Sequence, residues 1–298
     1  MKPPLPPPIA KRGPVAEAVE RQVASNRSGK GHEAYFAGHR LRLTQEILRL
    51  APAGGRGRLC LLGAGNANDV DLDSLAERYE EIHLVDVDAE AVDGAAARAA
   101  QAHPGRLMAH APVDASGILD RLTAWARRPP APAELPGEMQ AAVARVCGAV
   151  PGPFDVVASC CLLTQLQLVL LEVVRDRNPH FDQLRAILNG IHVRTLAALL
   201  APGGVALLVT DLTGNDTYPL DELPPDTDLG KLMVDLLAAG NIIHAVHPGR
   251  LSAEIRRDPE LRARYAVRFP VGPWLWKNGP DRTYLVCALE IAARRATG

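Results

Sequence analysis

The stretch that decides the fold is Leu59-Cys60-Leu61-Leu62-Gly63-Ala64-Gly65-Asn66-Ala67-Asn68-Asp69. An apolar run is followed by two glycines separated by one residue, which predicts a buried strand that runs into a tight turn. Ligands of open parallel sheets bind at the carboxyl ends of the strands, where glycines let the backbone approach them closely. The stretch therefore predicts a ligand-binding turn after the first strand of such a sheet.

Apolar strands and helices alternate downstream of this turn. Strands are predicted at 58–62, 82–87, 107–113, 154–159 and 205–209, with helices at 71–79, 88–102 and 116–125 and a long helical stretch ending at Leu200. This alternation predicts an α/β fold with a doubly wound, mostly parallel sheet.

Two further strands are predicted at the end of the chain, at 265–276 and 284–291. The connection between them is so short that only antiparallel pairing is possible, because a parallel crossover needs about a dozen residues or more. The predicted sheet therefore has seven strands and ends in an antiparallel hairpin.

The chain is expected to divide into three segments. Residues 1–14 are proline-rich, which predicts a disordered tail, and residues 15–55 are expected to form a helical lid or substrate segment. Residues 56–298 form the predicted ligand-binding domain, with insertions near 127–153 and 211–264.

Composition excludes several classes of protein. Among 298 residues, 33 Lys and Arg balance 34 Asp and Glu, and this disfavours a nucleic-acid partner bound through bulk charge. No apolar run reaches the ~18 residues of a membrane span, and the N-terminal residues do not resemble a signal peptide. The five cysteines lack paired spacing, so we expect no metal site and no disulfide framework. A soluble protein of a reducing cytoplasm is the expectation.

An acidic residue stands where a bound nucleoside would need one. Asp86 ends the second predicted strand and lies 86 − 65 = 21 positions after Gly65, close to the spacing of about 20 for a carboxylate that binds ribose hydroxyls. A dinucleotide fingerprint would have glycine at position 68, but the chain has Asn68 followed by Asp69, whose charge would repel a pyrophosphate. Asn68 or Asp69 could instead bind the ammonium group of an amino acid, which favours S-adenosylmethionine (SAM) over NAD.

From about Leu59 to Ile291 the chain resembles the class I SAM-dependent methyltransferases, with their Rossmann-like fold. The resemblance rests on five motifs in order: the glycine-rich turn 60–65, the acidic segment 85–88, the segment 113–115, the strand 154–159 and the turn 200–204. Two positions depart from the family pattern. Leu61 replaces a frequent acid two residues before the first glycine, and Ala67 replaces a third glycine.

The resemblance implies SAM as the cofactor and assigns roles to individual residues. The implied cofactor contacts are Gly63, Ala64, Gly65 and Asn68 at the methionine end, Asp86 at the ribose, Val87 on the adenine, Asp114 and Ala115 at the adenine edge, and Ser159 beneath the sulfonium. Gly63 and Gly65 could instead form a plain turn, Asp114 could be an ordinary loop residue, and Asp86 could cap the next helix, although Asp88 is better placed to do so.

The acceptor side of the site is less defined by the sequence. Candidates for a catalytic group are Tyr35, His39, Gln165 and Tyr218, and none is identified as a general base. The hypothesis for residues 26–40 is that they fold over bound SAM as a lid. The alternative is that Tyr35 and Phe36 only anchor the following helix to the sheet.

The expected function is methyl transfer (EC 2.1.1.-) to a small, polar or amino-acid-like acceptor. Transfer of an aminopropyl or aminocarboxypropyl group is an alternative, and so is a SAM-binding protein without activity. RNA methylation is a further alternative because Arg27, Lys30, Arg40 and Arg42 form a local basic run. The acceptor atom, the oligomeric state and the pathway stay open.

Overall fold

Seven strands form a single sheet in a computed structural model that describes residues 13–54 and 56–294. The strand order is β3-β2-β1-β4-β5-β7-β6. The first five strands pair in parallel, and β7 is antiparallel to both β5 and β6. The strands are β1 Gly57–Leu62, β2 Tyr79–Val85, β3 Leu107–His110, β4 Phe154–Cys160, β5 Leu200–Gly214, β6 Tyr265–Lys277 and β7 Thr283–Ala293.

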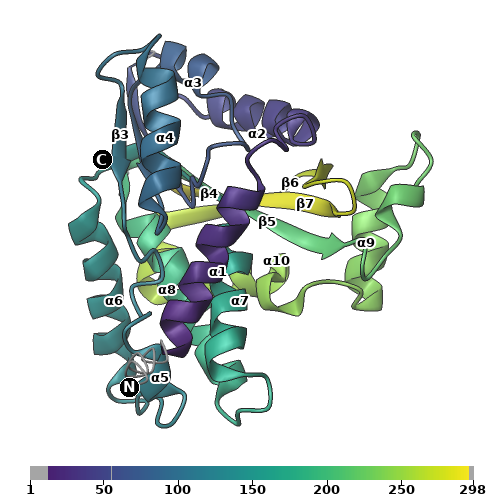
Figure 1. Ribbon diagram of the computed structural model, residues 1–298. Coiled ribbons are helices and arrows are strands. Elements are labelled where there is room, and N and C mark those ends of the chain that lie inside the picture. The colour runs from purple at the N-terminus through teal and green to yellow at the C-terminus, as the bar shows by residue number, and fades with distance from the viewer. Residues whose placement is uncertain (1–12, 55, 295–298) are drawn as a thin grey trace, which may run out of the picture.

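This order confirms the predicted fold, a doubly wound, mostly parallel, Rossmann-like sheet of seven strands with a C-terminal antiparallel hairpin. Helices cover both faces of the sheet, and α1 packs against α7 and α5 (Figure 1). The helices are α1 Pro14–Ser28, α2 Ala37–Arg49, α3 Leu72–Arg78, α4 Ala89–Ala100, α5 Leu122–Trp125, α6 Leu135–Ala149, α7 Leu162–Val174, α8 Phe181–Ala198, α9 Leu229–Ala239, α10 Pro248–Arg257 and α11 Pro259–Arg264, with short 3-10 turns η1 Leu220–Glu222 and η2 His244–Val246.

The continuous apolar strands are explained by burial on both faces. Successive side chains of a strand point to opposite sides, so Leu59 and Leu61 of β1 pack in one cluster with residues of α2, α3 and α4. Cys60 and Leu62 pack in a second cluster with residues of α8 and α10. Residues of α2 belong to the main core, so the predicted segment 15–55 packs directly against the sheet.

Several predicted boundaries are wrong. The long helical stretch is two helices, because α7 ends at Arg175, whose φ of 68° is not helical. The helix predicted from Ser116 begins only at Leu122, since the Asp114 carboxylate binds the backbone N–H groups of Ser116 and Leu119 in a turn. Strand β5 continues to Gly214, beyond the predicted 205–209.

The two predicted insertions have structure of their own. Residues 127–153 contain α6, and residues 211–264 contain the end of β5 followed by η1, α9, η2, α10 and α11. The part around α9 projects from the body of the molecule (Figure 1) and has a small apolar cluster with β7. Of the predicted tail 1–14, Pro14 already belongs to α1, and residues 1–12 lie outside the described part.

Within the described residues no single helix is both long and apolar enough to cross a membrane. One bent pair, Leu229–Ala239 with His244–Arg257, passes the same test of length and composition when its two helices are taken together. All five cysteines are free thiols.

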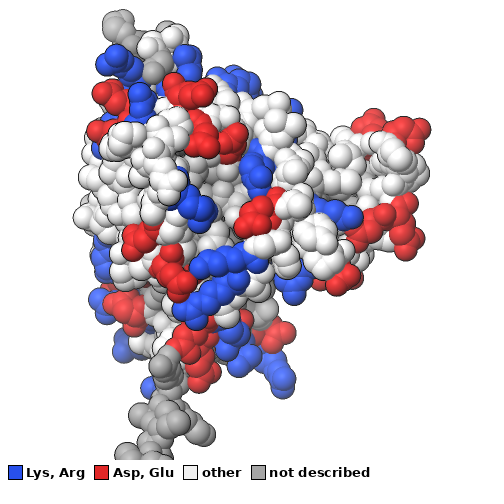
Figure 2. Space-filling model, turned by 45° about the horizontal axis from the view of Figure 1, so that its top comes forward, with Lys and Arg blue, Asp and Glu red and all other residues white. Residues whose placement is uncertain are grey.

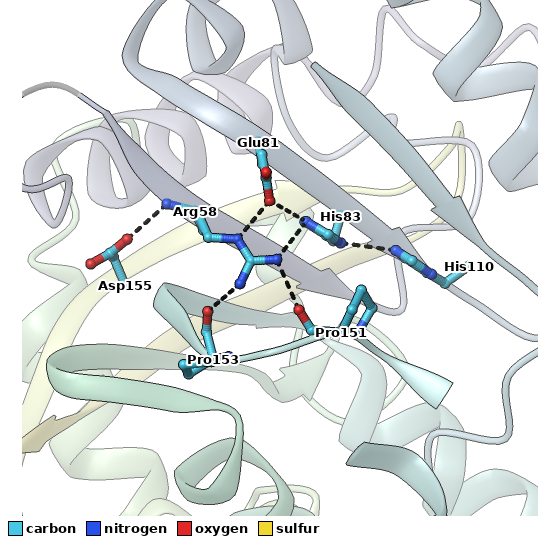
Figure 3. Close-up of polar contacts among 7 residues, drawn as sticks. All are labelled: Arg58, Glu81, His83, His110, Pro151, Pro153 and Asp155. Carbon is cyan, nitrogen blue, oxygen red and sulfur yellow. Dashed lines mark hydrogen bonds and ion pairs between the residues drawn. The ribbon is translucent and has the colours of Figure 1, made fainter. Parts of the chain in front are cut away.

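A polar cluster ties β1 to β2 and to the segment before β4 (Figure 3). The Arg58 guanidinium donates hydrogen bonds to Glu81 Oε2 at 2.6 Å and to the carbonyl oxygens of Pro153 at 2.7 Å and Pro151 at 2.8 Å. The backbone N–H of Arg58 donates to Asp155 Oδ2 at 2.8 Å. Arg58 therefore fixes the chain that enters β4 against β1.

Two histidines extend this cluster to β3. His83 Nδ1 and His110 Nε2 lie 2.9 Å apart, and His83 Nε2 lies 3.1 Å from Glu81 Oε2 (Figure 3). Two imidazoles share such a bond only while one facing nitrogen lacks a proton. Burial lowers the pKa of both histidines, the Glu81 carboxylate opposing the shift at His83.

The histidine pair predicts that stability decreases in mild acid. In the unfolded chain a histidine has a pKa of about 6.5, and in the folded protein the pKa of both histidines is lower. The neutral pair therefore contributes its full stability above about pH 6.5. This contribution is lost as the pH falls toward the folded-state pKa values. In urea titrations from pH 7.5 to 5, His110→Gln should lose less stability on acidification than the wild type. His244→Gln, at an exposed histidine, should follow the wild type; equal slopes for all three proteins would contradict the prediction.

Candidate functional site

The turn after β1 has the backbone geometry that its glycines permit. Gly63 has a φ of 75°, and its N–H and that of Ala64 donate to the Val85 carbonyl at 2.9 and 3.1 Å. A Cβ on Gly63 would lie 2.8 Å from Cβ of Leu162, the first residue of α7. A side chain at position 63 would thus collide with the helix that follows β4, so the glycine keeps the ends of β1 and β4 together.

Asp86 lies directly behind this turn. Its carboxylate accepts the N–H of Gly65 at 2.9 Å and that of Asp88 at 3.0 Å, and the residue is buried. Burial raises the pKa of Asp86, while the backbone N–H groups oppose the shift. Asp88 caps α4 through the N–H of Ala91, which confirms that it, and not Asp86, is the helix cap.

Two adjoining cavities open on either side of Asp86. In each, about 520 Å³ is free of protein atoms, a volume that takes in open solvent at the mouth. Both are lined by Asn26, Gly63, Asp86 and Gln165. The first, the apolar cavity, is lined also by Val19, Gln22, Val87, Val113, Asp114, Ala115, Leu119, Leu162, Leu166 and Val169. The second, the polar cavity, is lined also by Ser25, Gly29, Phe36, Ala64, Gly65, Asn66, Asn68, Asp69, Trp276 and Asn278.

The structure brings eight of the nine predicted cofactor residues to these cavities. Val87, Asp114 and Ala115 line the apolar cavity, whereas Ala64, Gly65 and Asn68 line the polar cavity, and Gly63 and Asp86 line both. The Asp114 carboxylate is already bound by Ser116 Oγ at 2.6 Å and by two backbone N–H groups. Asp114 therefore shapes the cavity wall through its own turn.

Ser159 is the exception among the nine. It is fully buried in β4, lines neither cavity, and its Oγ lies 2.9 Å from His192 Nε2 of α8. Burial lowers the pKa of His192 to about 4, so this pair is neutral at physiological pH.

Of the four predicted catalytic candidates, two lie at or behind the cavities and two lie elsewhere in the structure. Gln165 of α7 lines both cavities, and His39 of α2 is buried behind the polar cavity. Tyr35 is 40% exposed and lines neither cavity, and its ring contacts His32 edge-on. Tyr218 packs against the apolar cluster around α9, also outside both cavities.

Helix α1 lies over the cavities through Val19, Gln22 and Asn26, and the lid predicted for residues 26–40 overlaps this helix only at residues 26–28. Asn26 Nδ2 donates to Asp88 Oδ2 at 3.1 Å, and the carbonyl of Asn26 accepts a bond from Asn66 Nδ2 at 2.6 Å. A Cβ on Gly65 would lie 3.0 Å from Asn26 Oδ1, so α1 rests directly on the glycine turn. Ion pairs of Glu90 with Arg27 and Lys30 hold the end of α1 to α4.

The sequence singled out Asp69 as a possible ammonium ligand and His39 as a catalytic candidate, but it did not indicate that the two side chains lie next to each other. Asp69 Oδ1 is buried without a hydrogen bond, 3.5 Å from His39 Nε2. Burial raises the pKa of Asp69 to about 7 and that of Asp211 in β5 to about 6, although Thr164 Oγ1 donates to Asp211 at 2.6 Å. Asp211 stands just after the predicted strand 205–209, and this position was its only signal in the sequence.

In the part of the chain that the structure describes, no three His, Cys, Asp or Glu side chains are grouped as metal ligands. No protein-family model matches the sequence, and no curated protein matches it.

Among the solved structures with a similar fold are several methyltransferases and a protein named YcgJ, all at low identity. The 1,6-didemethyltoxoflavin-N1-methyltransferase of Burkholderia thailandensis is 15% identical over 98% of this chain and 94% of its own, with a TM-score of 0.45. YcgJ of Bacillus subtilis is 13% identical over 85% and 97%, with a TM-score of 0.44. The N-methyltransferase NodS of Bradyrhizobium japonicum is 13% identical over 85% and 94%, with a TM-score of 0.41. The fold is established by the strand order of the chain itself, and its function is inferred below from its own residues.

The glycine turn predicts a graded response to added methyl groups. Gly63→Ala should lower the free energy of unfolding by about 2–3 kcal/mol, because it combines a positive φ with a clash against Leu162. Gly65→Ala should cost about 1 kcal/mol, since the flexible Asn26 side chain can move away. Gly54→Ala meets no atom and is the control. Urea unfolding measures all three, and a Gly63→Ala protein as stable as the control would contradict the assigned geometry.

Proposed function

We propose that the protein is a SAM-dependent methyltransferase acting on a small molecule. The observation that carries this proposal is the placement of Asp86, backed by the N–H groups of Gly65 and Asp88, between an apolar cavity and a polar cavity. A nucleoside joined to a zwitterionic amino acid has three parts that match these features in order. The flat apolar base matches the apolar cavity, the ribose diol matches Asp86, and the charged amino-acid end matches the polar cavity.

The residues present fit such a cofactor. The apolar cavity, with Val87, Ala115 and Leu119, would hold the adenine, and the Asp86 carboxylate would accept hydrogen bonds from the ribose hydroxyls. Gly63, Ala64, Gly65 and Asn68 would hold the methionine part at the glycine-turn side of the polar cavity, which leaves the side with Phe36 and Trp276 for an acceptor. Gly63 and Gly65 carry no side chain, so the backbone of the turn is open to a ligand. A Cβ atom at these positions would meet Leu162 and Asn26, respectively.

Bound SAM would supply an activated methyl group on a sulfonium leaving group. The protein then needs to orient an acceptor in line with that methyl and to exclude water. Helix α1 covers the apolar cavity with Val19 and Gln22, and Phe36 and Trp276 close the polar cavity from another side. Gln165, which lines both cavities, is the polar side chain best placed to orient groups at their boundary.

A small acceptor fits the covered site better than RNA does. Acidic and basic side chains are interspersed over the face shown in Figure 2. Arg27 and Lys30, two members of the local basic run, are paired with Glu90, and Arg42 is paired with Glu46. RNA binding through phosphates would need these cations free.

Methyl transfer yields S-adenosylhomocysteine, whereas aminopropyl transfer would yield methylthioadenosine, so product analysis separates the two reactions.

Calorimetric titration tests the cofactor. SAM and S-adenosylhomocysteine should bind with micromolar affinity and NAD should not. Asp86→Asn should weaken both complexes at least tenfold, because a hydrogen bond to a charged group contributes about 1.5–3 kcal/mol. Asp93→Asn on the exposed face of α4 is the matched control. Failure of the wild-type protein to bind either compound would refute the proposal.

The position of α1 predicts how fast the cofactor exchanges. Asn26→Ala removes the bond to Asp88 and the contact with Gly65, each of which holds α1 closed. S-adenosylhomocysteine should then dissociate roughly five to ten times faster, the kinetic equivalent of about 1 kcal/mol for one hydrogen bond. Stopped-flow displacement measures the rate, with Ser28→Ala on the same helix as the control. Unchanged dissociation from the Asn26→Ala protein would show that α1 is not a lid.

A further inference from the structure

The inner wall of the polar cavity combines a carboxylate with aromatic rings. Asp69 and the rings of Phe36 and Trp276 line this wall, and the two ring centroids lie 5.7 Å apart. Tyr284 extends the aromatic group, with its centroid 5.3 Å from that of Trp276. The carboxylate thus lines the same cavity as flat apolar surfaces, and Asp69 does not line the apolar cavity.

His39 is held behind Asp69 in one tautomer. The indole N–H of Trp274, which can only donate, lies 3.0 Å from His39 Nδ1. Burial lowers the pKa of His39 to about 3, and the residue is only 1% exposed. His39 is therefore neutral with its proton on Nε2, and this N–H faces Asp69 Oδ1 at 3.5 Å. The Asp69 side chain keeps 20% of its surface exposed although Oδ1 is buried, which leaves Oδ2 for a ligand.

The charges around Asp69 do not include a cation bound to it among the described residues. Arg40 of α2 lowers the pKa of Asp69, but its guanidinium donates to the carbonyl oxygens of Asn68 and Glu33. Asp211 of β5 raises the pKa of Asp69. The thiols of Cys160 and Cys161 at the end of β4 have pKa values raised by burial and stay neutral.

A positively charged group is the ligand that this wall lacks. An ammonium group beside Asp69 would pair with the carboxylate, and an ammonium over an aromatic face gains a further ~0.5–2 kcal/mol. A hydroxyl group would leave the carboxylate without a counter-charge in a buried place. The wall therefore discriminates between an amine and an alcohol of the same shape.

We propose that the methyl acceptor is a small amine with an apolar, flat substituent, and that Asp69 receives its ammonium group and takes the proton. This inference rests on the proposed methyltransferase function. Transfer of one proton from the ammonium to Asp69 frees the nitrogen lone pair, which forms the new N–C bond. The S–C bond breaks as that bond forms, the sulfur keeps its electron pair, and the methylated nitrogen again carries the positive charge.

The test uses calorimetry on the protein saturated with S-adenosylhomocysteine. The probes are phenethylamine and tryptamine, each with the alcohol in which a hydroxyl replaces the amino group. Both amines should bind at least tenfold more tightly than their alcohols. Asp69→Asn should abolish this preference, and Trp276→Leu should weaken both amines severalfold. Asp73→Asn, with an exposed side chain close in sequence, is the matched control and should leave the preference unchanged.

The pH dependence and the cofactor affinity complete the test. Amine affinity should rise between pH 6 and 8 in the wild type, as Asp69 ionises, and should not in Asp69→Asn. Asp69→Asn should bind S-adenosylhomocysteine as the wild type does, which also shows that the variant is folded. Weaker S-adenosylhomocysteine binding would instead place Asp69 at the cofactor's own ammonium group and overturn the inference.

Two other results would also overturn it: alcohols that bind as well as the amines, or amines that do not bind the saturated protein. Failure of the wild type to bind S-adenosylhomocysteine at all would refute the proposed function itself, so the two failures are distinguishable.

Discussion

The parallel pairing of β1 with β4 is the constraint on which the site depends. Leu59 to Leu62 pair with Val156 to Ser159, and at this pair the strand order changes direction, so the chain leaves β1 toward one side of the sheet and β4 toward the other. A crevice forms where two such connections diverge. Gly63 keeps that crevice narrow at its base, because only hydrogen fits against Leu162. Both cavities meet at this glycine, so the position of the whole site follows from the β1–β4 pair.

Buried carboxylates give the crevice its electrostatic character. Asp86 is compensated by two backbone N–H groups, and Asp211 by the Thr164 hydroxyl, but Asp69 has only a distant imidazole N–H. A carboxylate in such a place favours a bound cation, because desolvation disfavours its charged form until a counter-charge arrives. A sulfonium and an ammonium would both meet this need. The same acids would repel phosphates, which agrees with the absence of a glycine at position 68 and with the proposal that the ligand is SAM and not NAD.

The parts of the site that local sequence determines were predictable, and those that depend on tertiary packing were not. The glycine turn, Asp86 and the Asp88 cap follow from residue type and spacing along two consecutive βα units. Ser159 fails as a cavity residue because side chains alternate along β4: Val157 packs with the residues of α8, and Ser159 points the same way, to His192. Asn26 and Trp276 reach the site from the two ends of the chain, and no periodicity in the sequence indicates which residues of α1 or β6 face the glycine turn. The break between α7 and α8 was missed although Asn178 and Pro179, a pair typical of turns, stand between the two helices.

Side-chain hydrogen bonds join helix α1 to the glycine turn, and under the proposed function they would couple cofactor binding to the position of α1. Asn66 and Asn68 belong to the turn, and their side-chain amides donate to the carbonyl oxygens of Asn26 and Gly29 at the end of α1. Any ligand that fixes the turn therefore also favours closed α1, and by linkage closed α1 must favour that ligand to the same extent. Residues of α1 form one wall of the apolar cavity. In the polar cavity, Phe36 and Trp276, which lie outside α1, form part of the wall. An acceptor that enters beside these rings would reach a cofactor already covered by α1, an order of binding that keeps the sulfonium away from water until the acceptor is in place.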